Sequence, residues 1–114
     1  GPMASLRHAG EWLAAHGRPG ARVMDRKPYV PFFAGMRQVL MPDDDYDTII
    51  DHALRAGVDY VVVEEYVMWG MRRQFVPLMT DSTFRAREGR LQMVYGAGDG
   101  AMTGVAIFEV LRGP

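Results

Sequence analysis

The sequence contains no cysteine, which excludes disulfides, thiolate zinc sites and cysteine nucleophiles together. It also lacks a long apolar run, because its most apolar stretch, 60–63, is only as long as a strand. A membrane-spanning helix needs about 18 to 20 such residues. Neither sign of charge dominates, with 13 Lys and Arg against 14 Asp and Glu. This balance disfavours a nucleic-acid-binding protein, which normally carries a basic excess.

The chain has 114 residues, 48% of them hydrophobic, which suits one domain with its own core. No repeat, linker or low-complexity tract divides it, so we expect a single α/β domain over residues 5–114. Gly1-Pro2 has the form of a remnant left after protease removal of a purification tag, and Met3-Ala4 can come from a vector. We therefore place residues 1–4 outside the expected fold.

The first third of the chain predicts one helix and two short strands. Ser5 can cap a helix whose apolar residues recur on one face until Gly17. The apolar runs 21–24 and 38–41 predict strands. Between them, residues 28–35 form either one helical turn or an apolar loop.

The middle of the chain carries the clearest helix and the most apolar strand. Three successive carboxylates, 43–45, suit the amino end of a helix, and Gly57 suits its carboxyl end. The run 58–65 that follows is apolar and rich in β-branched residues, without alternation. Such a strand is typical of a parallel sheet that helices cover on both faces.

The last third predicts a helix over 67–79 and two strands near 91–95 and 103–111. The glycine-rich loop 96–100 between these strands predicts a hairpin connection. The expected fold is thus α/β, a small three-layer sandwich with about three parallel strands, flanking helices and a C-terminal antiparallel hairpin.

Two motifs resemble ligand sites that the sequence does not complete. Asp43, Asp45 and Asp47 alternate like the start of a calcium loop, but Thr48 and Leu54 hold the places of its glycine and glutamate. Helix capping explains these aspartates better. The glycines of 96–100 lead into an apolar strand, whereas a dinucleotide loop needs a helix there.

Neither a metal nor a cofactor is predicted. The three histidines, His8, His16 and His52, are far apart and have no partners at ligand spacing.

The candidate ligand-binding residues gather where two predicted strands end. Ligands of parallel α/β sheets bind outside the carboxyl ends of the strands. Acidic, basic and tyrosine side chains follow both strands and suit a sugar, a phosphate or a peptide. The candidates are Asp25, Arg26, Lys27, Tyr29, Glu64, Glu65 and Tyr66. The alternative is structural, with Arg26 or Lys27 pairing with one of the two glutamates to hold the loops.

A second candidate surface is apolar. Met68, Trp69 and Met71, with the pair Phe32-Phe33, would form an interface if they were exposed together. The alternative is that most of them pack in the core.

Four stretches, residues 9–13, 20–24, 26–35 and 57–65, occur in a recognisable order. Their sequences are AGEWL, GARVM, RKPYVPFFAG and GVDYVVVEE. This order resembles the C-terminal soluble domain of bacterial polytopic membrane glycosyltransferases, the protein-O-mannosyltransferase-like group of the GT-C superfamily. The match is good over residues 5–66 and loose beyond them.

The resemblance implies sugar transfer from a polyprenyl-phosphate donor at the extracytoplasmic (periplasmic) face of the bacterial inner membrane. The catalytic acids of that family lie in a loop between membrane helices, so no catalytic residue carries over to this chain. The implied partners are the transmembrane part of the parent chain and a sugar, a lipid-linked sugar or a protein acceptor.

Three hypotheses follow. The first is a non-catalytic accessory domain of such a glycosyltransferase, which helps to position acceptor or donor or holds a partner protein. The second is an independent enzyme that uses two carboxylates, such as Asp25 and Glu64, for acid–base chemistry. The third is a pure interaction module that associates around Met68, Trp69 and Met71.

Overall fold

The computed structural model describes residues 2–98 and 104–113, which contain one five-stranded mixed sheet of order β2-β1-β3-β5-β4. Its strands are β1 (Arg22–Asp25), β2 (Arg37–Leu40), β3 (Tyr60–Glu64), β4 (Leu91–Ala97) and β5 (Val105–Val110). Strands β2, β1 and β3 are parallel, whereas β5 runs antiparallel to β3 and to β4. The predicted combination of three parallel strands and an antiparallel C-terminal pair is confirmed.

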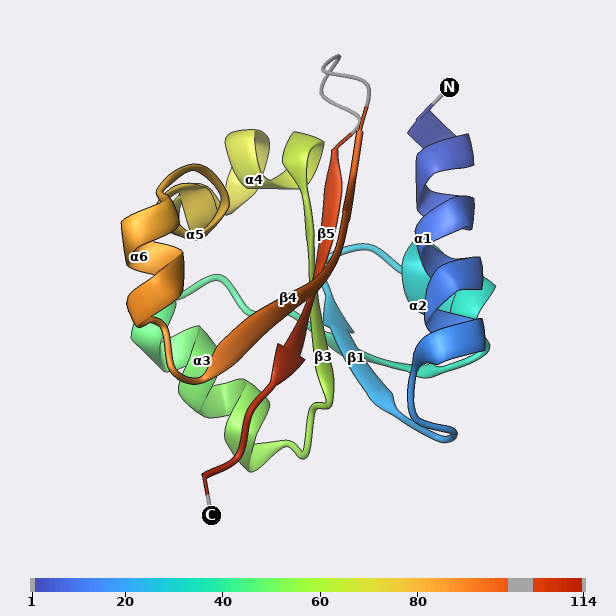
Figure 1. Ribbon diagram of the computed structural model, residues 1–114, viewed down its shortest axis with the longest axis horizontal. Coiled ribbons are helices and arrows are strands. Elements are labelled where there is room, and N and C mark those ends of the chain that lie inside the picture. Colours follow the sequence, from blue (N-terminus) through green and yellow to red (C-terminus); the bar gives the residue numbers. More distant parts are fainter. Residues whose placement is uncertain (1, 99–103, 114) are drawn as a thin grey trace.

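Helices cover both faces of the sheet, which Figure 1 shows nearly edge-on between them. One layer contains α1 (Pro2–His16) and α2 (Tyr29–Ala34). The other contains α3 (Tyr46–Arg55), α4 (Glu65–Met71), the 3-10 turn η1 (Arg73–Phe75), α5 (Val76–Thr80) and α6 (Ser82–Arg87). The fold is therefore the predicted three-layer α/β sandwich.

The central strand β3 separates two apolar cores. All five of its residues are buried, as its unbroken apolar run predicted. Tyr60 and Val62 face the core under α1 and α2, and Val61 and Val63 face the core under α3 to α6. This alternation also decides on which side of the sheet the side chains at the strand ends lie.

The first helix begins earlier than predicted. It starts at Pro2 rather than after a cap at Ser5, so residues 2–4 form its first turn. Proline suits that position because its missing N–H has no partner in a first turn. The helical alternative for residues 28–35 is correct, since they form α2 and its left-handed cap at Gly35 (φ 67°).

The prediction of one helix over 67–79 is wrong. The chain breaks at Arg72 (φ −143°, ψ 51°), whose guanidinium turns inward and donates a 3.0 Å hydrogen bond to the carbonyl of Met41. It then continues as η1 and α5, with Pro77 in the first turn of α5. Helix α6 was not predicted, although Asp81 caps it by accepting from the amides of Thr83 and Phe84. Of the predicted hairpin loop 96–100, residues 96 and 97 belong to β4, and residues 99 and 100 lie outside the described residues.

Helices α1 and α2 approach closely at Gly10. A Cβ there would clash with the Cβ of Phe33 and would lie 2.9 Å from the carbonyl oxygen of Val30. We expect Gly10→Ala to lower the free energy of unfolding by about 1–3 kcal/mol, because the two helices must separate. Gly70→Ala in α4 is the control, since a Cβ there meets nothing within 4 Å. Urea unfolding checks both, and an equal response would contradict this packing.

Candidate functional site

The two carboxyl groups that end β1 and β3 form the centre of the predicted site. Strands β1 and β3 are parallel neighbours, so Asp25 and Glu64 end at the same edge of the sheet. Both side chains lie on the face covered by α1 and α2, since they continue the alternation of Val23 and Val62. Asp25 is 1% exposed and Glu64 is 7% exposed. The structure therefore brings these two acids together, but inside the protein.

Burial changes the acidity of both groups. It is the main reason why the pKa of Asp25 is well above its ordinary value, and the charge of Glu64 raises this pKa further. The pKa of Glu64 is also raised, chiefly by burial, although Asp25 and the positive charge of Lys27 act against this. Oδ2 of Asp25 and Oε2 of Glu64 have no hydrogen-bond donor among the described residues. A proton shared between the two carboxyls would supply a donor, so we expect them to titrate as a pair.

The loop after β1 is fixed around this pair by backbone contacts. The amide of Lys27 donates a 3.0 Å hydrogen bond to Oδ1 of Asp25. The side-chain amide of Gln38 donates to the carbonyls of Asp25 (2.9 Å) and Lys27 (3.0 Å). The ion pairs of the described residues include none between Arg26 or Lys27 and the two glutamates. Hydrogen bonds therefore hold this loop, not the ion pair considered as the structural alternative.

The other predicted ligand-binding residues lie in different places around the pair. Glu65 faces away from the pair: its amide donates to the carbonyl of Gly104 (2.8 Å), and its Oε1 accepts from the Gly104 amide (3.3 Å). It therefore ties β3 to β5. Tyr29 and Tyr66 are exposed, at 39% and 69%. Arg26 is half-buried, as is Lys27. Among the described residues, no hydrogen bond joins either tyrosine to the two unpartnered oxygens of the carboxyl pair.

The residues of the predicted apolar interface differ in their exposure. Met68 is a core residue, 1% exposed, so its place in an interface is wrong. Trp69 packs against the same core, and the guanidinium of Arg73 lies 5.6 Å from its ring centre. Met71 is 40% exposed, and Phe32 is 76% exposed.

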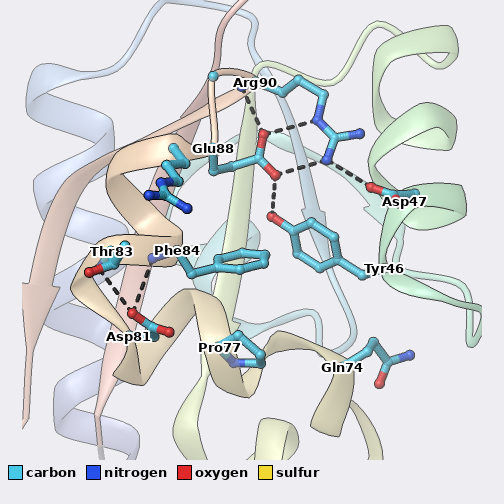
Figure 2. A pocket seen from close by; sticks show the side chains of 11 residues that line it. Tyr46, Asp47, Gln74, Pro77, Asp81, Thr83, Phe84, Glu88 and Arg90 are labelled. Carbon is cyan, nitrogen blue, oxygen red and sulfur yellow. Dashed lines mark hydrogen bonds and ion pairs between the residues drawn. The ribbon is translucent and has the colours of Figure 1, made fainter.

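A groove that the sequence did not predict lies elsewhere, between the start of α3 and the segment from η1 to α6. Its volume is about 710 Å³. Figure 2 shows the rings of Tyr46 and Phe84 at its centre, with Pro77 and Gln74 on one side and Glu88 with Arg90 on the other.

The wall of the groove is a charge-assisted network around Glu88. Arg90 donates to both oxygens of this carboxylate from Nε and Nη2, each at 2.9 Å, and the hydroxyl of Tyr46 donates at 2.7 Å. Nη2 of Arg90 also donates to Asp47 at 2.9 Å. Burial alone would raise the pKa of Glu88, but the hydrogen bonds from Arg90 and Tyr46 outweigh it and lower the pKa to about 2. Glu88 is therefore ionised at neutral pH, and its hydrogen bonds are charge-assisted.

The sequence contains only one weak local signal for this groove. Asp81, followed by Ser82 and Thr83, can start a helix. That signal would have predicted α6 as a separate helix beside the one before it. The contacts between Tyr46 and Glu88 span 42 positions, and no local pattern encodes them.

Of the three aspartates explained as helix caps, only Asp45 caps α3. Asp43 pairs with Arg72 (3.6 Å), and Asp47 pairs with Arg90 (2.9 Å). Asp45 accepts a 2.9 Å hydrogen bond from the amide of Thr48, as the capping interpretation predicted. Over residues 2–98 and 104–113, no group of three or more histidines and acids is arranged to hold a metal ion. Within the same ranges, no helix has the length and apolar character needed to cross a membrane.

Comparisons with known proteins found no similar protein. No family model, curated protein or solved structure matches the chain.

Proposed function

We propose that the chain is an accessory domain of a bacterial membrane glycosyltransferase, of the group that its sequence resembles, and that it catalyses no step itself. It would lie beside the transmembrane part of its parent chain, on the extracytoplasmic face of the inner membrane. There it would help to position the acceptor or the polyprenyl-linked donor, or hold a partner protein.

One observation carries the non-catalytic part of this proposal: the burial of the strand-end acids. A general acid or base must reach its substrate within hydrogen-bond distance. Asp25 and Glu64 are 1% and 7% exposed, and their unpartnered oxygens are sealed from solvent. The pair instead lies where β1 and β3 end, just before the loop that carries Lys27 and the helix α4 that carries Tyr66. We propose that it positions these two segments.

An enzyme that uses the same two acids is the second candidate, because the raised pKa of Asp25 suits a general acid. This function would require the loop over the pair to open. The two candidates differ in one measurement. An accessory domain leaves sugar donors and glycosides unchanged, whereas an enzyme turns one of them over and loses this turnover in Asp25→Asn.

The exposed tyrosines are the side chains of this edge that can contact a partner or substrate. We expect Tyr66→Ala, in the full-length transferase, to raise KM for the acceptor several-fold with little change in kcat, because positioning contacts act on binding. Met93→Ala on β4, which removes another exposed apolar side chain, is the control. Equal KM values for Tyr66→Ala and wild type would remove Tyr66 from the proposed contact surface.

The proposed membership in the membrane glycosyltransferase group is tested by the coding sequence upstream of Ser5. The proposal predicts several segments of about 20 apolar residues there, the last of them ending shortly before α1. A reading frame that starts at Met3 would contradict the proposal and make the enzyme hypothesis the leading one.

A further inference from the structure

The groove beside α6 has the properties of a binding site that the proposed function does not use. Its volume of about 710 Å³ falls within the range typical of small-molecule pockets, roughly 300–1,000 Å³. Its wall is held in place before any ligand arrives, because Glu88 is fixed by Arg90 and Tyr46. Such pre-organisation lowers the entropic cost of binding.

The charges around the groove nearly cancel. Glu88 and Arg90 neutralise one another, and Asp47 shares the same guanidinium. Asp81 and Arg87 add one charge of each sign to the lining. The lining thus holds three carboxylates and two guanidiniums, a net charge of −1. An anion finds no excess of positive charge here, and one net negative charge is too little to select a strongly cationic ligand. The groove favours a ligand that is neutral and polar.

The groove is lined by both hydrogen-bond donors and hydrogen-bond acceptors. Arg87 can only donate, Asp81 and Asp47 accept, and the Gln74 amide can do both. Beside them lie the apolar surfaces of Tyr46, Phe84 and Pro77 (Figure 2). A sugar ring offers the same mixture, with hydroxyls that donate and accept and C–H faces that pack on aromatic rings.

We propose that this groove binds a neutral saccharide. The inference adds a site to the proposed accessory function and does not depend on the residues at the strand ends. It holds or fails separately from the membrane attachment of the parent chain.

Amide chemical-shift mapping of the ¹⁵N-labelled chain tests it, with cellobiose and methyl α-mannoside as neutral probes and inorganic phosphate as the anionic probe. We expect saturable shifts at Gln74, Thr83 and Phe84 with a saccharide and none with phosphate. Thr83→Trp, which fills the groove, should weaken binding at least about tenfold. Ser82→Trp is the matched control, because its neighbouring position is equally exposed but does not line the groove.

Arg87→Ala provides a second variant, with the exposed Arg55→Ala on α3 as its control. It should also weaken saccharide binding. The absence of saturable shifts with either saccharide would overturn the inference, as would equal affinity in Thr83→Trp and wild type. Groove shifts caused by phosphate alone would assign an anion site and overturn it too. None of these outcomes changes what the upstream coding sequence says about the proposed function.

Discussion

The free energy of unfolding is expected to fall as the pH rises above about 4, and Asp25→Asn should remove most of this fall. The buried pair causes it. Both carboxyls have pKa values above those of the unfolded chain, so the folded protein binds a proton that the unfolded chain has released. Stability from the pair is therefore complete below the unfolded values, 3.8 and 4.5, and is lost as the pH rises through the folded values.

The size of the effect is set by one proton, at most about 1.4 kcal/mol per pH unit. The asparagine of Asp25→Asn would keep the oxygen that accepts from the Lys27 amide and would carry no charge, so the variant should exceed wild type in stability at pH 8. Asp51→Asn, an exposed aspartate on α3, is the control. Urea unfolding at a series of pH values checks the prediction. Parallel profiles for wild type and Asp25→Asn would contradict a proton-sharing pair.

The second large effect is expected from Arg90→Met, which should lower the free energy of unfolding by about 2–3 kcal/mol at neutral pH. The substitution leaves the carboxylate of Glu88, whose side chain is 5% exposed, with two donors, the hydroxyl of Tyr46 and the backbone amide of residue 90. Removing one partner of a buried ion pair typically costs about 3–5 kcal/mol. We expect less here because the side chain of Arg90 is itself 35% exposed.

Two further variants separate a lost ion pair from a general surface effect. Arg90→Met combined with Glu88→Gln should recover part of the loss, since no buried charge then remains unpaired. Arg55→Met removes an exposed arginine of α3 and should change stability by less than about 0.5 kcal/mol. In wild type, the low pKa of Glu88 predicts the opposite pH dependence to that of Asp25. Its contribution is present above pH 4.5 and is lost as the pH falls toward 2. If Arg55→Met and Arg90→Met were equally destabilising, the network would have no special role.

The parts of the fold that the sequence predicted depend on local patterns. The apolar run of β3 predicted a strand covered on both faces, and the cap at Asp45 marked the start of α3. The break at Arg72 could not be predicted, because it depends on the carbonyl of Met41, 31 positions away. Tertiary contacts overrode the helical pattern there.

The position of the candidate site along the chain was predicted from local patterns, but its burial was not. Strand-end positions placed Asp25 and Glu64 at one edge, but the sequence does not show that α1 and α2 cover that face. Glu64 ends β3, whereas Glu65 begins α4 and contacts Gly104, although the set of seven candidates had placed the two glutamates together. The groove was not predicted from the sequence. Tyr46 is far along the chain from Glu88 and Arg90, and these residues come together only in the folded chain.

We propose that this domain positions a substrate or partner and does not catalyse. The most direct test is the transfer rate of the full-length enzyme that carries Asp25→Asn and Glu64→Gln together, measured at a pH where both proteins are folded. We expect a kcat within about twofold of wild type, because acids sealed from solvent would touch no reacting group. A fall of several orders of magnitude in kcat, with the fold intact by circular dichroism, would contradict it and make the pair catalytic.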